Sequence, residues 1–112
     1  MFEIKFKKGG VLKEFSKDYV NVEDNLLALE HQVSQTALYE KKEDLLNPAK
    51  HRELNEAYLD MFVKMYGEQF DVDDLKGASV ETLEILNELY LAALGGKQEE
   101  KETTEGKKKK KG

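Results

Sequence analysis

The sequence predicts a mostly α-helical protein with a small N-terminal β-hairpin, an α+β fold in which three main helices pack on the hairpin. Apolar and charged residues alternate only at the N-terminus, which is typical of a half-buried strand. From residue 21 onward, apolar residues recur at helical spacing instead. The 112 residues include one proline and no tryptophan, so we expect helices separated by few rigid turns.

Residues 2–19 are predicted to form the hairpin. Gly9 and Gly10 permit a tight reversal between the two strands. On the returning strand, Val11 and Phe15 can face the same core as the first strand, whereas Leu12 falls on the opposite face. Because a two-stranded hairpin is marginally stable alone, helices or strands of neighbouring subunits must cover its apolar side. The first strand supplies three residues to that side: Phe2, Ile4 and Phe6.

The first helix is predicted from about residue 22 to about residue 43. Asn21 is a possible N-cap, and the positive charge of Lys41 and Lys42 suits a helix C-terminus. The helix carries a narrow apolar stripe, made by Val22, Leu26, Leu29, Val33 and Ala37.

A second helix is predicted over about 48–66, because Asn47 is a good N-cap and Pro48 suits the first helical position. Gly67 ends it. The following segment, 67–78, is predicted to be a turn with a short helical piece. Its apolar residues Phe70, Val72 and Leu75 tuck under the bundle. The core side of the second helix is predicted to consist of Leu54, Ala57, Tyr58, Met61, Phe62 and Met65.

The last helix is predicted over 79–94, between a Ser79 cap and Gly95-Gly96. Its charges gather in one narrow strip, while apolar side chains cover most of the remaining circumference. Two interpretations stay open: a central core helix, or a helix with one side docking another copy or another protein. The predicted partner contacts, not divided here between core and interface, are Leu83, Leu86, Leu89, Tyr90 and Leu94.

The chain is predicted to form a single α-rich domain over residues 1–96, followed by a disordered lysine-rich tail over 97–112. The tail contains no apolar residue, so it cannot bury enough surface to offset the entropy of ordering. Residues 1–96 carry 11 Lys or Arg against 19 Asp or Glu, a net charge of −8. An acidic body repels the phosphate backbone, so nucleic-acid binding is not expected outside the tail.

Catalysis, cofactors and metals are not expected. The two histidines, His31 and His51, lie on different predicted helices without metal-ligand spacing. The acidic segment that begins at Asp71 does not have the glycine and the terminal glutamate at the positions that a calcium-binding loop requires. It is interpreted as a capped, solvated turn. Without cysteine there is no disulfide or thiol nucleophile. We find no signal peptide and no apolar run of membrane-spanning length, so a soluble, intracellular protein without membrane contact is expected.

The run Lys107–Lys111 has three interpretations. It can be a solvated basic tail without a role of its own, or a weak polybasic contact for an acidic surface. It also requires a message of adenine and guanine only, on which a ribosome can slip, so that a shorter and a longer, frameshifted product would share the same domain.

The chain begins with a hairpin of sequence MFEIKFKKGG, continues with acidic helices that contain NLLALEHQ and NEAYLDMFVKMYG, and ends with a hydrophobic last helix and a polar tail. In these features it resembles the tail assembly chaperones of long-tailed phages that infect Gram-positive bacteria. The resemblance implies a non-enzymatic protein made in two forms by frameshifting, which holds the tape measure protein soluble and recruits the major tail protein for tube assembly. It also implies action in the host cytoplasm and absence from the mature virion.

Two further possibilities accompany this resemblance. Self-association along a long client would be multivalent, so that weak single contacts suffice. The alternative function is an acidic interaction adaptor or regulatory module that binds a basic partner.

Overall fold

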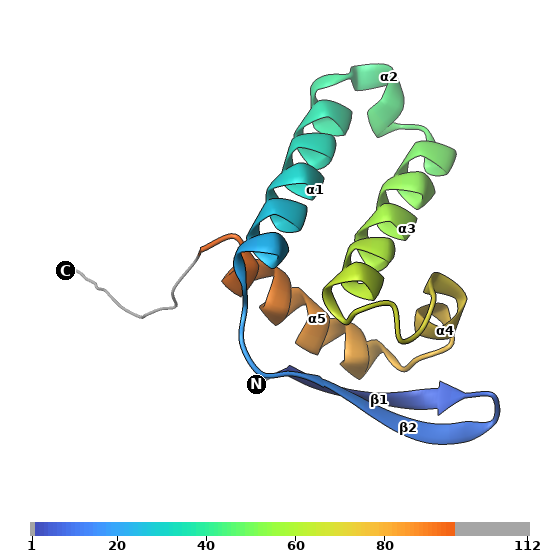
Figure 1. Ribbon diagram of the computed structural model, residues 1–112. Coiled ribbons are helices and arrows are strands. Elements are labelled where there is room, and N and C mark those ends of the chain that lie inside the picture. Colours follow the sequence, from blue (N-terminus) through green and yellow to red (C-terminus); the bar gives the residue numbers. More distant parts are fainter. Residues whose placement is uncertain (1, 96–112) are drawn as a thin grey trace.

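A computed structural model describes residues 2–95 of the chain, and over this range it confirms the α+β class (Figure 1). An antiparallel hairpin comes first, and helices follow it. The strands are β1 (Phe2–Lys8) and β2 (Val11–Lys17). The helices are α1 (Val22–Glu40), α2 (Lys42–Leu45), α3 (Pro48–Met65), α4 (Val72–Lys76) and α5 (Val80–Ala93).

The hairpin turns at two glycines whose backbones adopt the left-handed conformation, with φ of 63° at Gly9 and 80° at Gly10. A two-residue loop with both φ values positive matches the right-handed twist of the paired strands. Ile4 pairs with Phe15 across the strands, and both side chains are buried. The hairpin thus offers one apolar face to the helices.

Val11 does not join the core, contrary to the prediction, and 59% of it is exposed. Its position alternates correctly with Phe15, so its orientation is not the cause. At this end of the hairpin the contact with the helices is polar: Lys8, the cross-strand neighbour of Val11, pairs with Asp74 of α4, and Val11 itself stays exposed.

The first predicted helix ends three residues earlier than expected, at Glu40 rather than near residue 43. Its start is as predicted, because the Asn21 side chain accepts a hydrogen bond from the backbone N–H of Asp24. The backbone of Lys41 is extended, with φ of −106° and ψ of 109°, and α2 begins after it. Lys41 and Lys42 therefore do not form the last turn of α1.

The apolar stripe of α1 faces away from the core, contrary to what amphipathic periodicity ordinarily indicates. Val22 is 75% exposed and Val33 is 69% exposed. The buried face is instead formed by small, aromatic and charged residues together with one leucine: Asp24, Ala28, His31 and Leu38.

The α3 helix begins as predicted, with the Asn47 side chain accepting from the backbone N–H of Ala49. Its last turns are buried, and Phe62 is fully enclosed. The predicted core side is wrong at one position, since Ala57 is exposed, and it omitted Val63, which is buried. Phe70, in the loop before α4, and Leu75, within α4, are buried as predicted. Phe70 packs on Phe15 of the hairpin with a ring-centroid distance of 4.9 Å.

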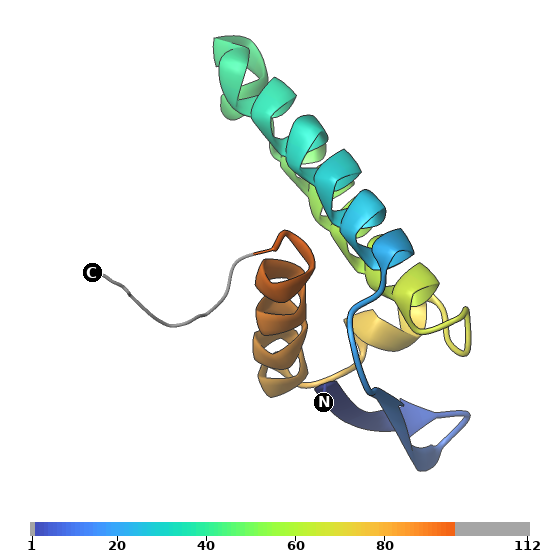
Figure 2. The ribbon, with the colours of Figure 1, turned by 60° about the vertical axis from the view of Figure 1, so that its left-hand side comes forward.

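The helices form two groups. α1 and α3 lie side by side as a helical hairpin that extends well beyond α5 (Figures 1 and 2). α5 packs on β1 and on the first half of α1, and it fills the angle between the helical hairpin and the strands. α4 also contacts β1. The core lies where α5, the end of α3 and the strands meet.

Two ion pairs join the hairpin to the helices. Lys17 of β2 contacts Asp24 of α1, with 2.7 Å between Nζ and Oδ2, and both side chains are largely buried. Lys8 of β1 contacts Asp74 of α4 at 2.8 Å near the surface. The hydrogen bond with Lys8 is the main reason why the pKa of Asp74 lies below its usual range.

The predicted tail over residues 97–112, and with it the domain boundary at residue 96, lies outside the described residues. Among the helices of residues 2–95, none is both long and apolar enough to cross a membrane.

Candidate functional site

The five predicted partner contacts on α5 occupy different environments. Leu86 and Leu89 are 1% and 0% exposed and belong to the core. Leu83 is 38% exposed, and Tyr90 and Leu94 are half-buried against the core. Partner binding by this set stays a prediction, but only Leu83, Tyr90 and Leu94 offer surface without movement of the helix. The charged strip, Glu81, Glu84 and Glu88, is exposed.

A long surface depression runs along α3, and we call it the α3 groove. Its main part has a volume of about 780 Å³. Two hollows of about 220 and 250 Å³ adjoin it: the first shares Leu59 and Lys76 with the main part, and the second shares His51 and Asn55 in the first half of α3. Leu83 lines the first hollow and Tyr90 the second, so the groove reaches α5. The main part is lined by Leu45, Leu46, Pro48, His51, Arg52, Asn55, Glu56, Leu59 and Lys76.

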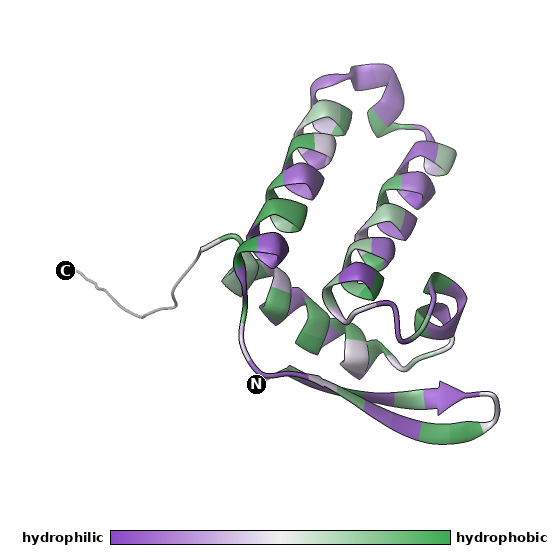
Figure 3. Ribbon diagram, viewed as in Figure 1, coloured by the Kyte–Doolittle hydropathy of each residue, from purple (hydrophilic) through white to green (hydrophobic). Residues whose placement is uncertain are grey.

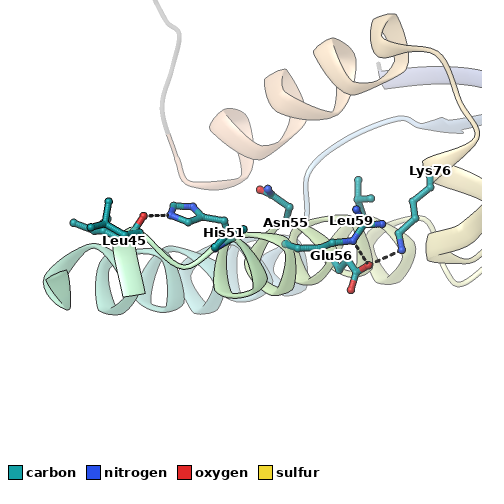
Figure 4. A pocket seen from close by; sticks show the side chains of 9 residues that line it. Leu45, His51, Asn55, Glu56, Leu59 and Lys76 are labelled. Carbon is teal, nitrogen blue, oxygen red and sulfur yellow. Dashed lines mark hydrogen bonds and ion pairs between the residues drawn. The ribbon is translucent and has the colours of Figure 1, made fainter. Parts of the chain in front are cut away.

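The groove combines apolar side chains with a few anchored polar ones. Asn55 and Leu59 point from α3 toward α5 (Figure 4). His51 donates from Nε2 to the Leu45 carbonyl oxygen at 2.7 Å, which holds α2 against the start of α3. Leucines and one proline between fixed polar groups suit the apolar side of a helix or an extended peptide better than a small polar substrate.

Glu56 lines the groove beside α4. Its Oε2 pairs with Lys76 and with Arg52, the latter at 3.3 Å. The hydrogen bond with Lys76 is the main cause of a lowered pKa at Glu56. This carboxylate stays ionised at neutral pH and adds a polar boundary to an apolar floor.

An aromatic junction joins α1, α3 and α5 beside the groove. His31 is 9% exposed. Its ring packs against that of Tyr58 at a tilt of 37° with ring centroids 4.9 Å apart, and it makes an edge-to-face contact with Tyr90 at 5.8 Å. The Tyr58 hydroxyl donates to Asn87 Oδ1 at 2.6 Å. Burial lowers the pKa of His31, because loss of contact with water disfavours the charged imidazolium.

Acid should weaken the fold through His31. A histidine whose pKa is lower in the folded than in the unfolded protein contributes its full stability above the unfolded pKa, about 6.5. This contribution is lost as the pH falls from about 6.5 toward the lower folded pKa. We expect the free energy of unfolding, measured by urea titration, to decrease from pH 7 to pH 5, and to decrease less in His31→Gln.

Urea titrations of the same two proteins between about pH 5 and pH 3 serve as a control. In this range the ion-paired carboxylates Glu56 and Asp74, whose pKa values are lowered, become protonated, and the resulting loss of stability should be the same in both proteins. Equal slopes between pH 7 and pH 5 for the wild type and His31→Gln would contradict the assignment to His31.

Leu45 and Leu46 are groove residues that the sequence analysis did not identify. Leu46 is 87% exposed. A signal was present, since two adjacent leucines lie beyond the stripe of the first helix and directly before Asn47-Pro48. Such a pair has no place in the predicted core and is a candidate for contact with a partner.

The structure brings His31 and His51 to one hollow, although they belong to different helices. Within residues 2–95, no three His, Cys, Asp or Glu side chains are grouped in a way that could hold a metal ion. The acidic turn at Asp71 is a capped helix start, as predicted: the Asp71 side chain accepts from the Asp74 N–H, and the Asp74 side chain accepts from the Asp71 N–H.

The comparison with protein families decides what kind of protein carries this groove. The model of a family described as phage tail chaperone protein matches residues 1–111. The chain belongs to the phage tail chaperone family. Searches of curated proteins and of solved structures gave no match.

Membership in the phage tail chaperone family favours assembly of phage tails over the acidic adaptor, and it places the general class of partner among tail proteins. The family is one of chaperones rather than of enzymes. A depression with an apolar floor is the kind of site that such a protein needs, since chaperones bind surfaces that would otherwise aggregate.

Proposed function

We propose that this phage tail chaperone binds the tape measure protein, keeps it soluble and helps to recruit the major tail protein for tube assembly. The observation that supports this proposal most directly is the α3 groove, which presents apolar side chains to solvent over three helices. A tape measure protein is long and helical, so its apolar stripes need cover before the tube forms. Residues 1–96, with a net charge of −8, would keep the complex soluble.

Within the groove, Leu83, Tyr90 and Leu46 are the proposed client contacts. Leu46 and Leu83 are the more exposed of the three, and Tyr90 forms the wall of the hollow beside His31. Leu86 and Leu89 hold α5 on the hairpin and are not expected to touch the client. Leu94 is half-buried one turn after Tyr90 and is a further proposed contact, outside the groove itself. Several copies along one client would raise the avidity without strong single contacts.

The proposed role requires neither catalysis nor a cofactor, and it takes place in the host cytoplasm before the virion is complete. We include a longer product made by frameshifting at the codons of Lys107–Lys111, because that run of lysines demands a message of adenine and guanine. Both products would share the groove.

Co-expression with the tape measure protein of the same phage tests the proposal. In Leu46→Glu/Leu83→Glu, the soluble fraction of the tape measure protein should fall about tenfold or more, because burying an unpaired carboxylate costs more than about 1.4 kcal/mol. The matched control is Val11→Glu/Leu12→Glu, which makes the same charge change at exposed apolar residues of the hairpin end.

The control should keep the tape measure protein soluble, and circular dichroism should show both variants folded. A groove variant that is as effective as the control would remove the groove from the proposal. A wild-type protein without effect on the tape measure protein would refute the proposed client.

A further inference from the structure

The outward face of α1 carries a continuous apolar seam, which we call the α1 outer stripe: Val22, Leu26, Leu29 and Val33. These residues are 75%, 48%, 40% and 69% exposed. Their spacing of four, three and four residues is that of the a and d positions of a coiled coil. The stripe spans about 17 Å at 1.5 Å per residue, or more than one heptad. Hydrophobic positions recur along α1 on the ribbon coloured by hydropathy (Figure 3).

The stripe lies opposite the part of α1 that the fold buries. Ala28 and His31 are buried in the core. When Leu26 is assigned to position a, Ala28 falls at position c and His31 at position f, which lie on the side of the helix away from the seam. Asn25 donates from Nδ2 to the Ala93 carbonyl oxygen at 2.7 Å, which holds the end of α5 beside the first turns of α1 rather than over the stripe. Apolar residues at consecutive seam positions differ from the singly scattered ones that occur on any protein surface.

Neither the tail of this chain nor a second copy of the chain is a suitable partner for the α1 outer stripe. The tail, residues 97–112, contains no apolar side chain that could cover the seam. In a second copy, antiparallel pairing would place the flanking residues Glu23 and Glu30 against their equivalents, with like charges opposed. Parallel pairing would place them against Asn25 and Gln32, without any opposite charge.

The flanks of the stripe are complementary to a basic partner. Glu23 and Glu30 are exposed along one edge, at the positions that face a partner's flanking residues in a coiled coil. The other edge has the uncharged amides of Asn25 and Gln32, and none of these four residues is basic. A helix with Lys or Arg beside its own apolar seam would pair with the acidic edge and meet no repulsion at the other.

We propose that the α1 outer stripe docks an amphipathic helix of another protein, one with an apolar heptad seam flanked by Lys or Arg. The stripe is separate from the α3 groove, so a bound helix here and a client in the groove do not exclude each other. The inference depends on the seam, its exposure and its flanking charges, and it does not rest on the client proposed for the groove.

Two synthetic helices of three heptads test this proposal by fluorescence anisotropy. Both carry Leu at a and d; one has Lys at e and g, the other Glu, and like charges keep each from pairing with itself. The full-length protein should bind the Lys peptide at least about tenfold more tightly than the Glu peptide. Leu26→Glu/Val33→Glu should lose about tenfold or more in affinity, whereas Val11→Glu/Leu12→Glu should not.

The comparison separates docking from general attraction. Glutamates added on the stripe make the protein more acidic, so a purely electrostatic attachment of the Lys peptide would become tighter, as in the hairpin control. Glu23→Gln/Glu30→Gln should reduce both the preference for the Lys peptide and its dependence on salt. Equal affinity of the stripe variant and the hairpin control would overturn the proposal.

The proposal would also be overturned if the stripe bound a second copy of this chain. Sedimentation velocity would then show a wild-type dimer that Leu26→Glu/Val33→Glu dissociates. The groove variant Leu46→Glu/Leu83→Glu should bind the Lys peptide as the wild type does. Failure at the stripe is therefore distinguishable from failure of the groove to bind the tape measure protein.

Discussion

Replacing Asp24 by alanine is expected to lower the free energy of unfolding by about 3–5 kcal/mol, as measured by urea titration at pH 7. The carboxylate is 3% exposed and lies 2.7 Å from the Lys17 ammonium, whose side chain is 12% exposed. Without Asp24, that ammonium would stay buried and unpaired. The backbone N–H of Asn21, which donates to the same carboxylate, would lose its partner at the start of α1.

Glu23→Ala is the matched control, because Glu23 precedes Asp24 on the same turn and is exposed. It should change the stability by less than about 0.5 kcal/mol. The joint substitution Lys17→Met/Asp24→Leu removes both charges and should recover much of the loss, since no charge is then left buried. If Asp24→Ala were as mild as Glu23→Ala, the ion pair would not join the hairpin to α1 as the geometry indicates.

The second large effect is expected at Leu89. This side chain is 0% exposed, so Leu89→Ala should cost about 2–5 kcal/mol in the free energy of unfolding, from lost burial and from the cavity that remains. The measurement is again urea titration, with the denaturant dependence checked for two-state behaviour. The substitution decides whether Leu89 belongs to the core of the free protein.

Leu83→Ala is the comparison, because Leu83 lies on the same helix and is 38% exposed. It should cost about 1 kcal/mol or less, and its effect should appear in client solubility instead. Similar losses of stability at both positions would mean that Leu83 is as much a part of the core as Leu89. The pair of variants thus divides the predicted contact set into packing and surface residues.

Sequence patterns predicted the type and order of the elements well, because their signals are local. Alternation and two glycines indicated the hairpin, and Asn21 and Asn47 marked the starts of α1 and α3. The break after Glu40 was not predicted, since Lys41 and Lys42 are acceptable helix residues and carry no breaking signal.

The candidate site was predicted less completely. Leu83 and Tyr90 do line the groove, but the set also included Leu86, which reaches the same hollow as Leu83 while only 1% of it is exposed, and Leu89, which is fully buried. On a helix that is apolar over most of its circumference, periodicity does not distinguish a core residue from a surface one. The groove itself depends on how α2, α4 and α5 lie beside α3, which no local pattern determines.

The sequence by itself determined where the strands and helices form, because caps, glycines and the period of apolar residues act within a few positions of the chain. Only the tertiary structure decided which face of each helix is buried. On α1, Asp24 forms an ion pair with Lys17, and the small side chain of Ala28 lets the helix approach the core closely. These two contacts orient the helix so that Asp24, Ala28 and His31 are buried. The more hydrophobic face was left to solvent, because a helix is oriented by all of its contacts together and not by its own periodicity.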